Sequence, residues 1–156
     1  MRKEIILKLI KKIPGISYNE IVRNTGLSNG VISHYLIKLM ESGEIEKEGI
    51  QRGKYFIKNI PKKDRNLITI LRNRTNNDVI RYLLTKENSE DAINASTIAK
   101  KVKKSGSTIS VSLKVLRKNK IIERKIMNKN LRLTNDIGYK ISNIKLWTAY
   151  CVKYNL

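Results

Sequence analysis

The stretch that decides the fold is Leu27 to Glu46, LSNGVISHYLIKLMESGEIE. Ile32, Leu36 and Leu39 recur in it at i, i+4 and i+7, a spacing that places them on one face of a helix. The opposite face carries small or polar residues: Asn29, Gly30, Ser33, His34 and Lys38. Such a face suits close approach to a polar surface better than it suits packing.

Two residues predict where this helix begins and ends. Ser28 comes just before the apolar pattern, where a side-chain oxygen can cap free backbone N–H groups. Gly43 follows the pattern, where a helix can end in a left-handed residue. The stretch therefore predicts a helix followed by a strand.

The same pattern returns without a gap 77 positions later as KSGSTISVSLKVLRKNKIIE, Lys104 to Glu123. Phe56 falls on Leu133 at this offset, which predicts that both copies have hairpins of equal length. Nearly all of the matched positions are core or cap positions, so the chain is predicted to contain two tandem units. The matched pairs are Ile16 and Ile93, Ile21 and Ile98, Ser28 and Ser105, Ile32 and Ile109, Ser33 and Ser110, Leu36 and Leu113, Leu39 and Leu116, Ile45 and Ile122, and Glu46 and Glu123.

The residues around the first copy predict three helices and a hairpin. An apolar stripe over residues 2–13 indicates an amphipathic helix that ends at Pro14-Gly15. Ser17 followed by Glu20 is typical of a capping box at the start of a second helix. Residues 45–48 and 54–57 alternate as strands around a turn bounded by glycines.

Three helices and a hairpin in this order resemble the winged helix-turn-helix family, and especially small prokaryotic and archaeal regulators of that type. The residues that carry the resemblance are Ser17 to Val22, Gly26-Leu27-Ser28, Val31-Ile32-Ser33, Leu36 and Leu39, Gly43-Glu44-Ile45, and the wing Gly49 to Gly53. The resemblance implies that a recognition helix enters the major groove of DNA and that the wing contacts the backbone or minor groove.

The predicted fold class is mainly α with small β-hairpin wings, in two tandem winged helix-turn-helix units plus a C-terminal helix. We expect a first unit over residues 1–60, a helical connector over 61–77 that ends at Asn76-Asn77, and a second unit over 78–135. Residues 136–156 are expected to form one final helix. This helix carries three aromatic residues at helical spacing, Trp147, Tyr150 and Tyr154. They predict packing or a homodimer interface. The alternative is that they form a platform on which the bases of single-stranded nucleic acid stack.

The charge of the chain favours a polyanionic partner. The 156 residues carry a formal net charge of +20 and a pI of about 10.2. Nucleic acid is the first candidate, because neutralising phosphates releases counterions, and an anionic membrane surface is the second. Most of the charge lies after residue 58, which predicts a more selective first unit and a more adhesive second unit.

The resemblance assigns the DNA-binding residues. In the first unit they are Ser28, Asn29, Gly30, Ser33, His34 and Lys38 on the recognition helix, and Arg52 and Lys54 in the wing. In the second unit they are Lys103, Lys104, Ser105, Gly106, Ser107, Thr108, Ser110 and Lys114, with Lys129 and Arg132 in the wing. Asn29 can bond adenine through two hydrogen bonds, and no arginine lies on either leading face to read guanine. The alternative interpretation is that the serines are caps and surface residues and that the wing tips are only solvated.

The sequence predicts no enzyme, no cofactor and no metal site. It has no Gly-rich phosphate loop, no H-E-x-x-H pattern and no nucleophile with a placed base. His34 is the only histidine and Cys151 the only cysteine, and neither has a ligand partner nearby in the sequence. With no secretory signal and no apolar stretch of about 18 residues, a cytoplasmic, nucleoid-associated protein is expected.

Three functions remain open at this point. The first is a transcriptional regulator that binds double-stranded DNA. The second is an architectural protein that coats DNA with little choice of sequence. The third is an interaction module of the transcription or RNA machinery, in which the tandem units bind protein or RNA.

Overall fold

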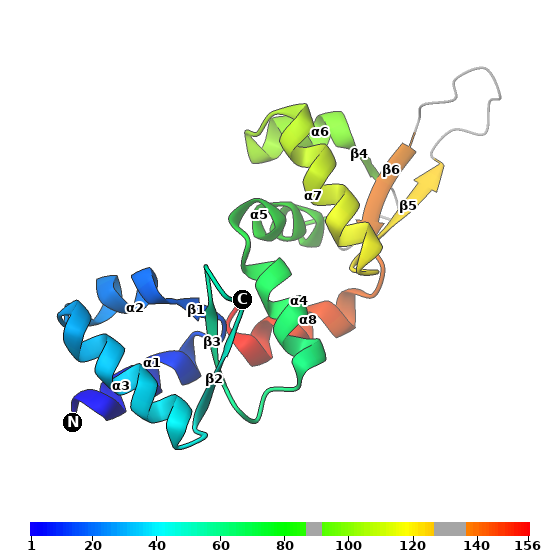
Figure 1. Cartoon of the computed structure of the whole chain (residues 1–156). Helices are drawn as coiled ribbons and strands as arrows, with labels where there is room; N and C mark the ends of the chain where they lie inside the picture. The colour runs from blue at the N-terminus through cyan, green and yellow to red at the C-terminus, as the bar shows by residue number, and fades with distance from the viewer. Residues whose placement is uncertain (87–91, 127–136) are drawn as a thin grey trace. The chain divides into compact units, whose positions relative to one another are not determined.

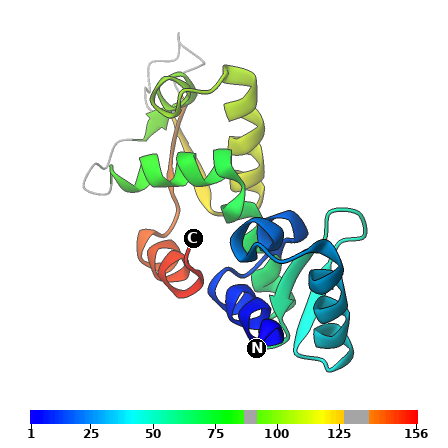
Figure 2. The same cartoon turned by 90° about the vertical axis from the view of Figure 1, so that its left-hand side faces the viewer.

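The computed structural model describes residues 1–86, 92–126 and 137–156. Its chain forms two compact units, one built on Met1–Thr69 and the other on Ile70–Tyr154. Both units are mainly helical and each carries a three-stranded antiparallel sheet, which confirms the predicted fold class of two repeated helix-and-wing units with a C-terminal helix (Figures 1 and 2).

The first unit places three helices before a hairpin. Its strands pair in the order β1-β3-β2, with Ile16 opposite Tyr55 and Ile45 opposite Ile57. The hairpin β2–β3 is the predicted wing. The elements are α1 (Arg2–Lys12), β1 (Ile16–Ser17), α2 (Tyr18–Thr25), α3 (Asn29–Glu41), β2 (Ile45–Glu48) and β3 (Lys54–Ile57).

The apolar stripes of these helices meet in one core. Ile6 and Ile10 of α1, Ile21 of α2, and Ile32 and Leu39 of α3 are completely buried. The capping box predicted at the start of α2 is confirmed. Burying these side chains fixes which face of α3 points inward, and so fixes which face points out.

The second unit repeats this plan. Its strands pair in the order β4-β6-β5, and Ile98, Ile109 and Leu116 are completely buried, as are their counterparts in the first unit. The elements are α5 (Arg74–Leu84), β4 (Ile93–Asn94), α6 (Ala95–Val102), α7 (Gly106–Lys118), β5 (Ile122–Ile126), β6 (Ile137–Ile141) and α8 (Ile144–Tyr154). The helix α4 (Lys62–Arg72) lies between the two sets of elements along the chain.

The second wing is longer than predicted. Ile45 pairs with Ile57 in the first unit, whereas its counterpart Ile122 pairs with Ile141. Positions 57 and 141 differ by 84 rather than 77, so the second hairpin contains seven more residues. The match of Phe56 to Leu133 was therefore wrong, and Lys140 occupies the position of Phe56 opposite a glutamate.

The final helix is correspondingly shorter than expected. The prediction that it begins near residue 136 was wrong, because Ile137–Ile141 form β6 and α8 begins at Ile144. Ile137 and Ile141 are four residues apart, a spacing that fits one face of a helix and equally fits one face of a strand. Pairing with both β4 and β5 selects the strand.

The break between α4 and α5 lies at Asn73, not at Asn76-Asn77 as predicted. The Asn73 side chain accepts a hydrogen bond from the backbone N–H of Asn76 and caps α5. Asn76 is buried, donates to the carbonyl of Ile70 (2.9 Å) and accepts from the hydroxyl of Ser112 (2.6 Å). These asparagines satisfy polar groups inside the fold, a role that a turn-forming composition does not reveal.

Two lysines of the second unit hold the backbone conformation of two glycines in the first. Lys103 (φ 58°) corresponds to Gly26 (φ 66°), and Lys120 (φ 59°) corresponds to Gly43 (φ 70°). A residue with a Cβ atom is strained in this left-handed region. The predicted tight turn is therefore kept in the second unit even though its glycines are not.

This strain predicts opposite effects of substitution in the two units. Lys120→Gly should stabilise the second unit by about 0.5–1 kcal/mol, and Gly43→Ala should destabilise the first by about 1 kcal/mol. Differential scanning calorimetry of the full chain measures both, as shifts of about 2–8 °C in opposite directions. Shifts of the same sign would show that backbone strain at these turns is not what the substitutions change.

Candidate nucleic-acid interface

The outward face of α3 presents the residues predicted to contact DNA. Ser28, Asn29, Gly30, Ser33, His34 and Lys38 are all exposed. Ser28 occupies the N-cap position, but its side chain makes no capping hydrogen bond, contrary to the capping interpretation. The Ser28 hydroxyl and the exposed head of α3 are thus open to a ligand.

Tyr18, the first residue of α2, contacts this head of α3. Its hydroxyl lies 2.9 Å from the carbonyl oxygen of Asn29, 3.4 Å from the Asn29 side-chain oxygen and 3.1 Å from the Ser33 hydroxyl. Sequence reasoning missed this residue, because its partners are 11 and 15 positions away. The tyrosine links the two helices of the helix-turn-helix at the point where bases would be read.

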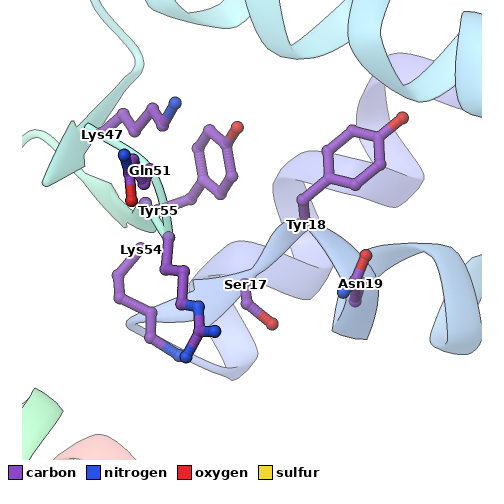
Figure 3. A pocket seen from close by; sticks show the side chains of 9 residues that line it. Ser17, Tyr18, Asn19, Lys47, Gln51, Lys54 and Tyr55 are labelled. Atoms are coloured by element: carbon purple, nitrogen blue, oxygen red, sulfur yellow. The ribbon is translucent and has the colours of Figure 1, made fainter. Parts of the chain in front are cut away.

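A hollow of about 520 Å³ opens between the start of α2 and the wing. Figure 3 shows Lys47, Gln51 and Lys54 on the wing side, Ser17, Tyr18 and Asn19 on the α2 side, and Tyr55 between them. Arg52 also lines the hollow, and none of its lining residues is acidic. The hollow is therefore lined by cationic and neutral polar side chains, the kinds of group that contact phosphate and sugar in protein–DNA complexes.

Two glycines of the wing, Gly49 and Gly53, determine where its basic side chains lie. Gly49 is left-handed (φ 89°), which allows the tight turn, and the Lys47 side chain lies across Gly53, where a Cβ atom would stand 2.1 Å from the Lys47 Cε. Arg52 is exposed and Lys54 half-buried. Burial, and secondarily the nearby Tyr18, raises the pKa of Tyr55, so this wall of the hollow stays neutral.

The outward face of α7 in the second unit differs in its chemistry. Ser105 caps this helix by accepting from the Thr108 backbone N–H (3.3 Å), as the alternative interpretation of the serines expected. Its hydroxyl also lies 2.8 Å from that of Thr108 and 3.1 Å from that of Ser107. These hydroxyls bond among themselves within one turn, while Gly106 and Ser110 are exposed beside them.

Exposed lysine side chains lie on the turn and on the recognition helix of this second helix-turn-helix. Lys103, Lys104 and Lys114 are all exposed. Lys103 and Lys104 form the turn between α6 and α7, and Lys114 lies on α7 itself. The two predicted wing contacts of this unit, Lys129 and Arg132, fall outside the residues that the structure describes.

Three residues of the first interface were not identified from the sequence: Tyr18, Lys47 and Gln51. Lys47 lies on β2 with a side chain that reaches over the hairpin to the Ile50 carbonyl (3.5 Å), so its place depends on the pairing of strands. Gln51 precedes Arg52 in the turn. The basic residues and flanking glycines of this turn could have pointed to Gln51 as well.

The aromatic side chains of the C-terminal helix α8 pack against one another. Trp147 and Tyr154 are buried, and the Tyr150 ring packs against both at 5.7 and 4.9 Å between centroids, which supports packing over a stacking platform. Burial raises the pKa of the Cys151 thiol, which favours its unreactive form. Within residues 1–86, 92–126 and 137–156, no helix is long and apolar enough to cross a membrane.

Residues 3–46 match the family described as winged helix-turn-helix DNA-binding. The match covers α1, β1, α2, α3 and the first residues of β2, and it contains Tyr18 and all six predicted residues on the recognition helix. Comparison with curated proteins finds no match.

Proposed function

Given that the first unit is a winged helix-turn-helix DNA-binding domain and that the second repeats its architecture, we propose that this protein is a regulator of transcription that binds double-stranded DNA through both units. In this proposal α3 and α7 each enter a major groove, and the first wing rests on the backbone or minor groove. The protein would then act at the nucleoid, without enzymatic activity.

The observation that carries the proposal is the continuity of the first interface. The exposed polar head of α3 and the cationic hollow share Tyr18, whose hydroxyl contacts Asn29 and Ser33 and whose ring lines the hollow. Base contacts specify and phosphate contacts position, and both kinds of group stand on one side of this unit.

The second unit is expected to increase the affinity of the chain for DNA. Its turn and recognition helix present exposed lysines beside small hydroxyl side chains, a combination that suits phosphates and reads little sequence. Two linked binding units raise the affinity of the chain above that of either unit, because the second contact is made within one complex.

In vitro selection of bound duplexes at two salt concentrations tests this function. We expect an enriched sequence whose affinity exceeds that of random duplex by at least 10³-fold, as for specific regulators. The bases that selection enriches most strongly should be those that α3 contacts. Two copies of the site in inverted orientation would indicate a homodimer, which the exposed Leu146 and Val152 of α8 favour.

Two results would replace the proposal with its alternatives. A ratio of specific to non-specific affinity near one would indicate the architectural function. Weak binding to B-form DNA together with tight binding to an A-form duplex would indicate an RNA-directed module. Both results are read from a competition assay in which the selected DNA duplex competes with random DNA duplex or with A-form RNA duplex of equal length.

A further inference from the structure

One hydroxyl group organises the head of the first recognition helix. The Tyr18 hydroxyl has a single proton and can also accept. It lies 2.9 Å from the Asn29 carbonyl oxygen, which can only accept its proton, and 3.1 Å from the Ser33 hydroxyl, where either group can donate. Because the single proton of Tyr18 is used at the carbonyl, we assign the Ser33 hydroxyl as the donor to the Tyr18 oxygen. This assignment satisfies all three groups with one set of hydrogen bonds.

This hydrogen bonding determines which donors and acceptors Ser33 and Asn29 present to a ligand. A free serine hydroxyl rotates and serves as either donor or acceptor, so it discriminates poorly between bases. With its proton directed to Tyr18, Ser33 presents its oxygen outward as an acceptor only. The Asn29 side-chain oxygen lies 3.4 Å from the Tyr18 hydroxyl and is a secondary acceptor of the same proton, so Tyr18 holds this amide less firmly than it holds Ser33.

The second unit lacks this arrangement. The residue that corresponds to Tyr18, 77 positions later, is Ala95, the first residue of α6. The head of α7 is bonded through Ser105, Ser107 and Thr108 within its own first turn instead. The two units have matching core residues. They differ at the position of Tyr18, which links α2 to α3 in the first unit and is Ala95 in the second.

We propose that Tyr18 is a specificity-determining positioning residue, which orders Asn29 and Ser33 before DNA binds and so makes the first unit the sequence reader of the pair. The partner is a base edge in the major groove that donates to Ser33, which the amino groups of adenine and cytosine can do. This inference rests on the proposed function, since it assigns the reading step to one face of one unit.

The test compares full-length wild type with Tyr18→Phe, which keeps the ring in the hollow and removes only the hydroxyl. Affinities are measured at one salt concentration for the selected duplex and for random duplex of equal length. We expect the affinity for the selected duplex to fall about 5- to 10-fold, as for the loss of one ordering hydrogen bond. The affinity for random duplex should stay within about 2-fold.

Tyr82→Phe is the matched control, because it removes a tyrosine hydroxyl from α5, outside the hollow and both recognition helices, and should leave the ratio unchanged. Ser33→Ala alone should lower the ratio, and the double variant Tyr18→Phe/Ser33→Ala should lower it little further, because the two hydroxyls act as one unit. Thermal unfolding of each variant checks that the fold is retained.

The outcomes separate this inference from the function on which it rests. An equal loss for both duplexes would overturn it, since Tyr18 would then bind phosphate directly. An unchanged ratio in Tyr18→Phe, or additive losses in the double variant, would also overturn it. If wild type itself shows no preference, the proposed sequence reading fails before any variant is compared.

Discussion

Replacing Arg65 with methionine should lower the free energy of unfolding of the first unit by about 2–3 kcal/mol. The Arg65 side chain is 4% exposed, and its Cζ atom lies 5.7 Å from the centre of the Phe56 ring. It donates to the carbonyls of Ile60 (2.9 Å) and Lys58 (3.3 Å) and to carboxylates on β2. Methionine fills similar space but donates nothing, so the buried carbonyl of Ile60 and the part-buried carbonyl of Lys58 lose this partner.

The loss comes mainly from the carbonyls, because the two carboxylates can return to water. Glu46 and Glu48 have side chains 39% and 44% exposed, so each alone contributes little as an ion pair. Glu46→Gln should therefore cost much less than Arg65→Met. Arg65→Lys should fail to restore stability, because an ammonium group cannot donate in several fixed directions at once.

Calorimetry of the full chain measures this effect as a fall of about 10 °C or more in the transition of the first unit. Hydrogen bonding from Arg65, and then its charge, lowers the pKa of Glu46 below its ordinary value of 4.5. The carboxylate contribution is thus complete above that ordinary value and is lost as the pH falls through the lowered pKa. The difference between wild type and Arg65→Met should narrow in acid, and full rescue by lysine would contradict the proposed geometry.

The sequence predicts the fold well where the core sets the spacing. Ile32, Leu36 and Leu39 are buried as their period requires, and the offset of 77 holds from Ile16 through Ile122. It fails after Ile122, because the pairing of Ile122 with Ile141 encloses seven more residues than the pairing of Ile45 with Ile57, and lengthening a loop by this much costs little free energy. The apparent match of Phe56 to an apolar residue came from the high frequency of such residues in this chain.

The site is less predictable than the fold, for a different physical reason. Exposure of Asn29, Ser33 and Lys114 follows from helical period alone. The link through Tyr18 depends on the packing of α2 against α3, and the reach of Lys47 over Gly53 depends on strand pairing. Neither leaves a periodic signal, although the replacement of Tyr18 by Ala95 is one of the positions at which the two copies differ.

Neutralising three lysines of the second unit should weaken DNA binding on the order of 100-fold near physiological salt. Lys103, Lys104 and Lys114 are exposed, and their counterparts in the first unit are Gly26, Leu27 and Ile37, none of which is charged. The three cations thus account for much of the proposed difference in adhesion. The variant Lys103→Gly/Lys104→Ala/Lys114→Ala keeps the left-handed turn at position 103.

The slope of log K against log salt concentration decides whether these lysines bind phosphate. Three lost contacts should reduce its magnitude by about 2.7, with the ratio of specific to non-specific affinity kept. The control removes three exposed lysines elsewhere, Lys8, Lys12 and Lys58, which lowers the net charge equally. If both variants flatten the slope by the same amount, overall charge and not the second helix-turn-helix sets the affinity. A large change in the first variant alone would assign adhesion to α6 and α7, while recognition remains with Tyr18 and α3.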